Sequence, residues 1–486
     1  MVIHQATTTG CKKLLRSRYF LGCWLAIILT LLANSIPDHT LNGDEAWIGE
    51  EAYFKAKDGY PHSHFFTGFY HQEERLVQYH YLFVTSESIL YSWFGFGLEV
   101  SRSIPILSGL IVLFLLWYCT RRMLGYSLEE MILTLCLFLS IPQAFFFFKI
   151  ARPEMMVTAL GFASALLLFR TEQRQNRTTV LLAGCGAGLA MLAHLNGMIF
   201  VVSGTLILLW KRRIIDATLF ATAALIAFTP YLIEIVTHFD LFRYQLSDPN
   251  NGPKSQLSIL SPLLNLSKEH QRLFRKPEII LPALIFLLSI IFSWKHTRLR
   301  FFRNYCVVLM IVFGIIVEDK TIKYSTYLAP FWALLIADAL WMLAGDTKKY
   351  WKILFAVSTS LFLLFGIYFQ FNDARQKEEY VTLNERIGKH LPDSAWCIAP
   401  MNFMYNQIER VNIISNVLVR FETHDHPSSD SLAAMCDRKN APYLIFNKYG
   451  DPVDNMTDLK TDRAHVLSLF DIVAEEQDFT IFKRKH

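Results

Sequence analysis

The sequence of 486 residues has few charged side chains and lacks the short motifs of nucleotide and zinc chemistry. Only 18% of its residues are Asp, Glu, Lys or Arg, whereas 53% are hydrophobic. This balance is too apolar for a soluble protein of this length and is typical of a chain with many membrane spans. No P-loop, GxGxxG or HExxH pattern is present, so ATP-driven transport and zinc hydrolysis have no support. A net charge of +5 gives no indication of a nucleic-acid partner.

The eight cysteines show neither a CxxC pair nor a Cys/His spacing of the zinc type. Six of them lie in or beside apolar runs, where a cysteine is usually a small buried hydrophobe. Cys397 and Cys436 lie in the polar C-terminal part. A disulfide between them and two free thiols are equally compatible with the sequence, if that part lies outside the cytosol.

Eleven apolar runs approach or exceed the length that crosses a bilayer. Clusters of Lys and Arg separate them, and with a cytoplasmic N-terminus every cluster falls on the cytoplasmic side, as the positive-inside rule requires. The first run lacks a small-residue cleavage site, so we expect a retained span rather than a signal peptide. The apolar runs lie at 19–36, 103–119, 130–148, 155–170, 179–194, 197–210, 214–233, 279–293, 303–317, 325–343 and 351–370, and the basic clusters at 12–18, 121–122, 170–177, 211–213, 295–303 and 348–352.

The segment 78–98 is apolar and aromatic, but the polar run from Thr85 to Ser88 interrupts it. A further span here would invert every later loop, so we expect an amphipathic helix at the membrane surface instead. The first outer loop then runs from about 37 to 102, and a second long outer loop from 234 to 278.

The hydropathy drops after about residue 371. The stretch "EEYVTLNERIGKHL" has helical spacing, whereas "AWCIA", "PYLIF" and "FTIFKR" are typical of short strands. The remaining length suffices for one small domain. We therefore predict an all-α polytopic membrane domain at 1–370, with about 11 transmembrane helices, and a small extracytoplasmic α/β domain at 371–486.

The first two outer loops each carry acids beside a predicted span. In "NGDEAW", Asn42, Asp44 and Glu45 fit an ordinary helix start with a capping box. The same carboxylates at a membrane face also fit a general base, or a site for a metal or a charged substrate. In "ARPEM", Arg152 and Glu154 either pair at a helix start or place a second acid on that face. A charge at the edge of the hydrocarbon is costly enough to favour function.

Two later outer turns are polar as well. In "HLNG", His194 and Asn196 either satisfy backbone groups at a tight turn or line a cavity. In "VEDKTIKYSTY", Lys320, Lys323 and Tyr324 fit interfacial anchoring, or a phosphate site at a helix start. The two lysines depart from the positive-inside trend, which favours the phosphate site.

Together, "GDEAWIGEEAYF", "ARPEM", "HLNG" and "KYSTYLAPFWALL" resemble the bacterial GT-C glycosyltransferases, in the protein mannosyltransferase-like group that includes the lipid A aminoarabinose transferases. The resemblance covers roughly residues 19 to 345 in motif order. It implies a GT-C-like fold and inverting transfer of a sugar from a polyprenyl-phosphate donor to a lipid, glycan or protein acceptor at the outer membrane face. The chain departs from the family pattern at "RPE", where relatives have an Asp.

The resemblance also implies roles for individual residues. Asp44 matches the general base, with Glu45 beside it, and Glu154 matches an acid on the acceptor or metal side of the cavity. Mg²⁺ or Mn²⁺ is compatible with these acids but not required by them. The expected location is the bacterial cell inner membrane, with the C-terminal domain in the periplasm. The residues expected to bind the donor phosphate are Lys320, Lys323, Tyr324, Arg152 and His194.

Other functions fit parts of the sequence. A polytopic transporter or flippase of a lipid-linked sugar is the main alternative, and it predicts ionisable residues near the midplane and repeated halves. Here the acids gather in outer loops, and no internal repeat is visible. A glycan ligase or polymerase of another membrane fold is compatible with the long loop at 234–278. A membrane-anchored protein whose C-terminal part binds carbohydrate is a further alternative.

Overall fold

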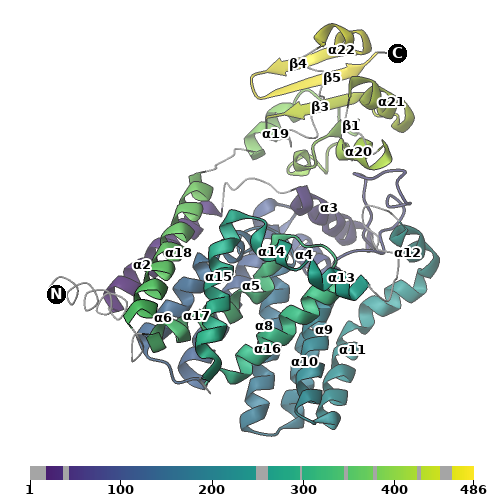
Figure 1. The fold of residues 1–486 in the computed structure, drawn as a ribbon. Helices are drawn as coiled ribbons and strands as arrows, with labels where there is room; N and C mark the ends of the chain where they lie inside the picture. The colour runs from purple at the N-terminus through teal and green to yellow at the C-terminus, as the bar shows by residue number, and fades with distance from the viewer. Residues whose placement is uncertain are drawn as a thin grey trace, which may run out of the picture.

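The computed structural model shows a helical bundle with a small sheet beyond one end of it (Figure 1). It describes residues 18–36, 43–247, 261–295, 298–343, 349–375, 380–423, 428–448 and 462–485. Residues 12–17 of the first basic cluster and the predicted cap Asn42 lie outside these ranges, as does the middle of the loop at 234–278.

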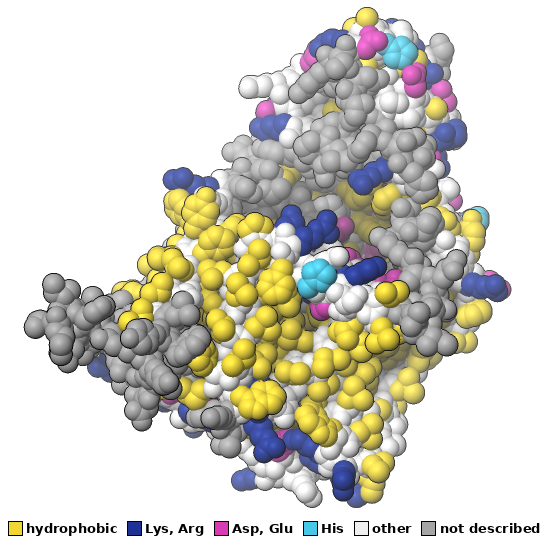
Figure 2. Space-filling view, viewed as in Figure 1, with side chains coloured by type: hydrophobic (Ala, Val, Ile, Leu, Met, Phe, Trp, Pro, Cys, Tyr) yellow, Lys and Arg dark blue, Asp and Glu magenta, His cyan; other side chains and the backbone are white. Residues whose placement is uncertain are grey.

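Each predicted apolar run is helical, because such runs satisfy their backbone hydrogen bonds internally wherever water is absent. Within the part of the chain that the structure describes, five segments are long and apolar enough to cross a membrane, namely Arg18–Ser35, Leu98–Met123, Glu154–Gln173, Ile214–Thr237 and Ile322–Met342. Large hydrophobic side chains cover the outside of the bundle (Figure 2). The count of eleven spans stays a prediction. The bundle helices are α2 (Arg18–Ser35), α5 (Leu98–Tyr118), α6 (Leu128–Ser140), α7 (Pro142–Phe147), α8 (Glu154–Gln173), α9 (Arg177–Ala193), α10 (Met198–Trp210), α11 (Ile214–Thr237), α15 (Pro277–Phe292), α16 (Arg300–Ile316), α17 (Ala329–Leu343) and α18 (Lys349–Arg375), with a π-turn η1 (Cys119–Met123) and 3₁₀ turns η2 (Leu195–Gly197), η3 (Ser293–Lys295) and η4 (Ile322–Leu328).

The prediction of one continuous span at 130–148 is wrong. The run 130–148 is divided into α6 and α7 at Ile141, whose backbone is extended (φ −71°, ψ 115°). Pro142 follows directly, and a proline disfavours helical geometry in the residue before it while suiting the first position of the next helix. The start of α6 has the capping box that its sequence specifies, formed by Ser127 and Glu130.

Helices α9 and α11 pack closely because α9 carries glycines at the contact. A Cβ atom on Gly184 would lie 2.3 Å from the Phe220 carbonyl oxygen, and one on Gly188 would lie 2.2 Å from the Ala224 carbonyl oxygen. This is the small-xxx-small spacing that brings helix backbones together in membranes.

The two ends of the bundle carry different features. At one end lie α3 (Gly43–Asp58), α4 (Tyr81–Phe94), α12 (Phe239–Leu246), α13 (Ser261–Ser267) and α14 (His270–Phe274), next to the sheet (Figure 1). Helix α4 lies within the segment 78–98, so the helix expected there is present. Its contact with a membrane surface stays a prediction. At the other end, residues of the predicted basic clusters lie together, because Lys211, Arg298 and Arg300 line one cavity.

The described residues of the C-terminal part form a five-stranded mixed sheet in the order β2-β1-β3-β5-β4. The strands expected from "AWCIA", "PYLIF" and "FTIFKR" are β1, β3 and β5, and two further strands were not predicted. Strands β1, β2 and β3 run parallel, and β5 pairs antiparallel with β3 and β4. The elements are α19 (Tyr380–Gly388), β1 (Trp396–Ala399), η5 (Met401–Met404), β2 (Asn412–Ser415), α20 (Val417–Thr423), α21 (Ser429–Lys439), β3 (Tyr443–Asn447), α22 (Arg463–Leu469), β4 (Phe470–Glu476) and β5 (Phe479–Arg484).

The sheet shares its hydrophobic core with the first outer loop. Phe66 of that loop stacks on Phe421 at 5.4 Å between ring centroids, and Ser415 N donates to Phe65 O at 3.0 Å. Lys439 Nζ donates to Thr67 O at 2.6 Å. Because of this joint core, the division into domains at 1–370 and 371–486 stays a prediction.

Cys397 and Cys436 are both buried free thiols, so the disulfide that the sequence left open is not formed. Cys397 Sγ donates to Asn412 O at 3.6 Å. Burial raises the pKa of Cys436 to about 12, which makes both its oxidation and its reaction with other thiols slow.

Candidate active site

Helix α3 presents the acids of the first outer loop. It begins at Gly43, so Asp44 and Glu45 fall in its first turn, where the helix dipole favours carboxylates. Successive residues point about 100° apart around a helix, since a turn takes 3.6 residues. The Asp44 side chain is accordingly 43% exposed, whereas that of Glu45 is completely buried.

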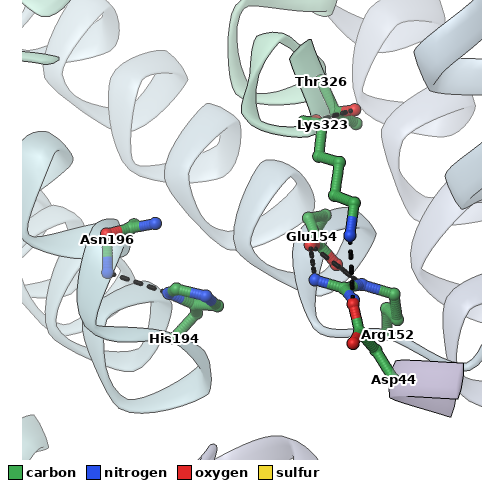
Figure 3. Close-up of polar contacts among 7 residues, drawn as sticks. All are labelled: Asp44, Arg152, Glu154, His194, Asn196, Lys323 and Thr326. Carbon is green, nitrogen blue, oxygen red and sulfur yellow. Dashed lines mark hydrogen bonds and ion pairs between the residues drawn. The ribbon is translucent and has the colours of Figure 1, made fainter. Parts of the chain in front are cut away.

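Arg152 joins the acids of the first two outer loops (Figure 3). Its Nη2 donates to Glu154 Oε1 at 2.7 Å, and its Nη1 donates to Asp44 Oδ2. Lys323 Nζ donates to the same Asp44 oxygen at 3.0 Å. Glu154 is fully buried behind Arg152, while Asp44 and Lys323 are partly exposed. The result is a cluster of two acids and two cations whose open side holds one carboxylate and one ammonium group.

The two lysines predicted for a phosphate site lie apart. Lys323 lies in the 3₁₀ turn η4, which Thr326 supports by donating to the Lys323 carbonyl at 2.9 Å. Lys320 is buried and donates to the carbonyls of Gly314 and Val317 at 2.8 and 2.7 Å. Its Nζ also pairs with Glu269 at 3.0 Å. Lys323 therefore contacts the charge cluster, whereas Lys320 binds backbone carbonyls at the end of α16 and the Glu269 side chain.

His194 lies across from the charge cluster in Figure 3. Its Nδ1 accepts from Asn196 N at 3.0 Å, and its ring stacks on His80 at 4.5 Å between centroids. Tyr324 meets His194 edge-on at 5.6 Å. Desolvation lowers the pKa of His80 to about 4, although nearby Glu154 opposes this shift. His80 is therefore neutral at pH 7, and the positive charge of the site comes from Arg152 and Lys323.

A cavity of about 390 Å³ lies between these elements, a size common for sites of small molecules. Figure 2 shows a hollow between the apolar bundle and the C-terminal part where acidic, basic and histidine side chains gather. The cavity walls come from α3, the loop before α4, the loop before α8, the turn after α9, helices α11 and α12, and the segment before η4. Its polar lining residues include Asp44, Glu51, Gln72, Gln78, Tyr79, His80, Arg152, His194, Asn196, Tyr231, Gln245, Glu318, Asp319 and Tyr324.

Glu45 binds away from the cavity, in the protein core. Its Oε1 accepts from Arg102 Nε at 2.9 Å and from Ala151 N at 2.8 Å, and its Oε2 accepts from Arg102 Nη2 at 3.1 Å. Arg102 is 1% exposed. This buried pair connects α3 to α5 and to the loop that carries Arg152, so it fixes the position of the charge cluster.

The two acids that were compatible with a metal, Asp44 and Glu154, both bind the Arg152 guanidinium instead of converging on a common point. A group with metal-ligand spacing among the described residues is His71, Glu73 and Glu74. These three residues do not line the cavity.

Sequence reasoning noted Glu51 only as one of four acids that follow the first span, without a role of its own, and it missed Arg102, His80, Trp47 and Gln72. Arg102 had a signal, because it precedes an apolar run as Arg152 does, and a charge in that place needs a partner. His80 is flanked by Tyr79 and Tyr81 in a segment that was read for its hydropathy alone.

Comparisons with known proteins agree on the fold. A family model described as dolichyl-phosphate-mannose-protein mannosyltransferase matches residues 87–234. The crystal structure of ArnT from Cupriavidus metallidurans bound to undecaprenyl phosphate superposes with a TM-score of 0.63 at 13% sequence identity, covering 96% of this chain and 98% of ArnT. Its apo structure gives a TM-score of 0.63 at 14% identity, with 95% and 97% covered. The comparison with curated proteins gave no match. The resemblance drawn from the motifs is thus confirmed: the chain has an ArnT-like GT-C fold and is a multi-pass membrane protein.

Proposed function

We propose that this protein is a membrane glycosyltransferase that transfers a sugar from a polyprenyl-phosphate donor to a lipid, glycan or protein acceptor. The observation that carries the proposal is the cluster on the cavity wall, in which Arg152 and Lys323 both contact the Asp44 carboxylate. The ArnT-like fold supports it, since that relative was crystallised with undecaprenyl phosphate.

The two cations suit the leaving group of the reaction. A lipid phosphate departs as a stable anion, so it needs fixed positive charge more than it needs a proton. Lys323 and Arg152 supply that charge, and the buried carboxylate of Glu154 holds Arg152 in place from behind. Tyr324 and His194 line the same cavity and shape the approach to it.

Asp44 is the proposed general base. The acceptor hydroxyl loses its proton as the anomeric carbon gains positive character, and a carboxylate within hydrogen-bond reach accepts that proton. Before the donor arrives, Asp44 is engaged by both cations. A donor phosphate competes for the same cations, and this exchange frees Asp44 to face the acceptor. A single displacement then inverts the anomeric centre.

We place Glu45 and Lys320 outside the catalytic machinery. Both side chains are buried and have their own partners, Arg102 for Glu45 and Glu269 for Lys320. Their proposed role is to hold α3 and the segment before η4 in position.

The proposed orientation puts the cavity at the outer face of the bacterial inner membrane, with the N-terminus cytoplasmic and the C-terminal part periplasmic. The basic clusters at the opposite end of the bundle favour this orientation under the positive-inside rule. The polyprenyl chain of the donor would stay in the hydrocarbon while its phosphate meets Lys323 at the surface.

The test is transfer of radiolabel from polyprenyl-phosphate sugars in membranes that contain the wild type, Asp44→Asn or no added protein. Loss of a general base lowers kcat by roughly 10²- to 10⁴-fold, so transfer should nearly vanish in Asp44→Asn. Asp58→Asn is the matched control, because Asp58 ends the same helix and pairs with His62 at 2.9 Å outside the cavity. Equal transfer in wild type and Asp44→Asn would refute the role of Asp44. Absence of transfer with every donor would favour the transporter function.

A further inference from the structure

One stripe of α3 lines the cavity. The residues are Asp44, Trp47, Ile48 and Glu51. Their spacing of three, four and seven residues places them on a single helix face. Asp44 stands at the end of the stripe beside the charge cluster, and Glu51 stands two turns away along the helix.

Three cavity-lining side chains carry a buried polar atom with no hydrogen-bond partner among the described residues. These atoms are Trp47 Nε1, Glu51 Oε2 and Gln72 Oε1. A buried polar group without a partner costs about 1–3 kcal/mol, so a ligand in the cavity that supplied partners to these three atoms would recover that energy. The indole nitrogen is a donor and the amide oxygen is an acceptor. A ligand that satisfies both must offer donors and acceptors together, as hydroxyl groups do.

The neighbours of Glu51 do not satisfy it. Lys55, the nearby cation, donates instead to Tyr79 Oη at 3.0 Å and to Thr85 Oγ1 at 2.8 Å. Glu50 accepts from the backbone amides of His64 and Phe65. Burial, together with the charges of Glu50 and Glu87, raises the pKa of Glu51 well above its ordinary value. A protonated Glu51 both donates and accepts, which again suits a neutral hydroxyl rather than a cation.

We propose that Trp47, Glu51 and Gln72 form the subsite that binds the ring hydroxyls of the transferred sugar. The proposal rests on the proposed function and adds the position and the chemistry of the sugar. Seven residues of helix advance about 10 Å, which leaves room for one sugar ring between Asp44 and Glu51 with a hydrogen bond at each end. The terminal torsion of a Glu side chain is soft, so the buried oxygen can turn toward the ligand. The phosphate then lies at the Arg152 end and the hydroxyls lie at the Glu51 end.

The test compares two lipid classes on the purified full-length protein. Binding is measured for undecaprenyl phosphate without a sugar, and for a panel of undecaprenyl-phosphate hexoses and pentoses with neutral hydroxyls. The variants are Glu51→Leu and Trp47→Phe, which keep the approximate side-chain size or the aromatic ring while removing the proposed hydrogen bonds. We expect each to weaken the bound sugar lipid about tenfold, equivalent to about 1.4 kcal/mol, and to leave the affinity for the sugar-free lipid unchanged.

Glu87→Leu is the matched control. Glu87 is as deeply buried as Glu51, and its Oε2 also lacks a partner among the described residues, but it does not line the cavity. An equal loss of sugar-lipid affinity in Glu87→Leu would overturn the proposal, because it would show a general effect on the fold. So would wild-type affinity in both Glu51→Leu and Trp47→Phe, or equal affinity of the wild type for both lipid classes. A wild type that binds neither lipid class would instead overturn the proposed function itself.

Discussion

Replacing Glu45 by alanine tests whether this acid positions the site or takes part in the reaction. Glu45 and Arg102 form a buried pair with two charge-assisted hydrogen bonds, at 2.9 and 3.1 Å. The Glu45 carboxylate also accepts from Ala151 N at 2.8 Å, one residue before Arg152. Removing one partner of a buried ion pair costs about 3–5 kcal/mol, because the remaining charge stays buried without compensation. We therefore expect Glu45→Ala to be strongly destabilised.

A double-mutant cycle shows whether the loss comes from the pair. The four proteins are the wild type, Glu45→Ala, Arg102→Met and the combination Glu45→Ala/Arg102→Met. The measurement is the amount of monodisperse protein left after heating in detergent, read by size-exclusion chromatography. The double variant should be more stable than Glu45→Ala alone, since it leaves no buried charge, and the coupling between contacting residues should be about 0.5–3 kcal/mol.

The activity of the folded fraction separates the two roles. With a positioning role, the folded double variant keeps measurable transfer, because Asp44, Arg152 and Lys323 are all present. The reasoning is refuted if Glu45→Ala melts like the wild type but lacks activity. That outcome would support a catalytic role for Glu45, as its position next to Asp44 in the sequence first suggested.

Two further predictions concern the charged groups. Lys323→Met should weaken binding of sugar-free undecaprenyl phosphate by roughly 10- to 100-fold. This factor corresponds to the loss of one hydrogen bond to a charged group, which contributes about 1.5–3 kcal/mol. Lys320→Met should instead lower the melting temperature and leave lipid affinity of the folded protein unchanged, and the reverse pattern would exchange the two roles. Burial raises the pKa of Glu87 from 4.5 to about 8, although its bonds with Ser101 and Tyr91 oppose the shift. The folded state then binds a proton that the unfolded state releases, so this contribution to stability is complete below about pH 4.5 and is lost as the pH rises to about 8. The melting temperature, plotted against pH over that range, should fall less steeply for Glu87→Gln than for the wild type. The same pH dependence in both proteins would contradict this prediction.

Much of the fold followed from local properties of the sequence. The apolar runs could be read as helices because each helix satisfies its own backbone, so length and hydropathy suffice. The break at Pro142 was missed since the run was judged by hydropathy alone, although the proline was visible. The strand at 396–399 was predicted from its β-branched and aromatic residues, but β2 and β4 were not, because strands depend on partners distant in the chain.

The site was predicted in part. The motif order drew attention to Asp44, Arg152, Glu154 and Lys323, which the structure brings together. The same reasoning named Asp44 as the general base but did not exclude Glu45 from the catalytic group, because adjacency in sequence says nothing about which residue faces a cavity until the helix is packed. Nor did it separate Lys320 from Lys323, whose environments depend on Glu269 and Asp44 in other loops.

The sequence by itself determined that the chain is apolar, helical and charged mainly at the ends of its runs, since these features depend on composition and short-range spacing. Only the tertiary structure decided which charges meet. Asp44 and Lys323 are separated by 279 positions along the chain, yet their side chains form a hydrogen bond of 3.0 Å. The packing of α3 against the bundle and the C-terminal sheet also turned Trp47 and Glu51 toward the cavity while burying Glu45. Contacts of this kind are set by the packing of surfaces far apart in sequence, which no local pattern encodes.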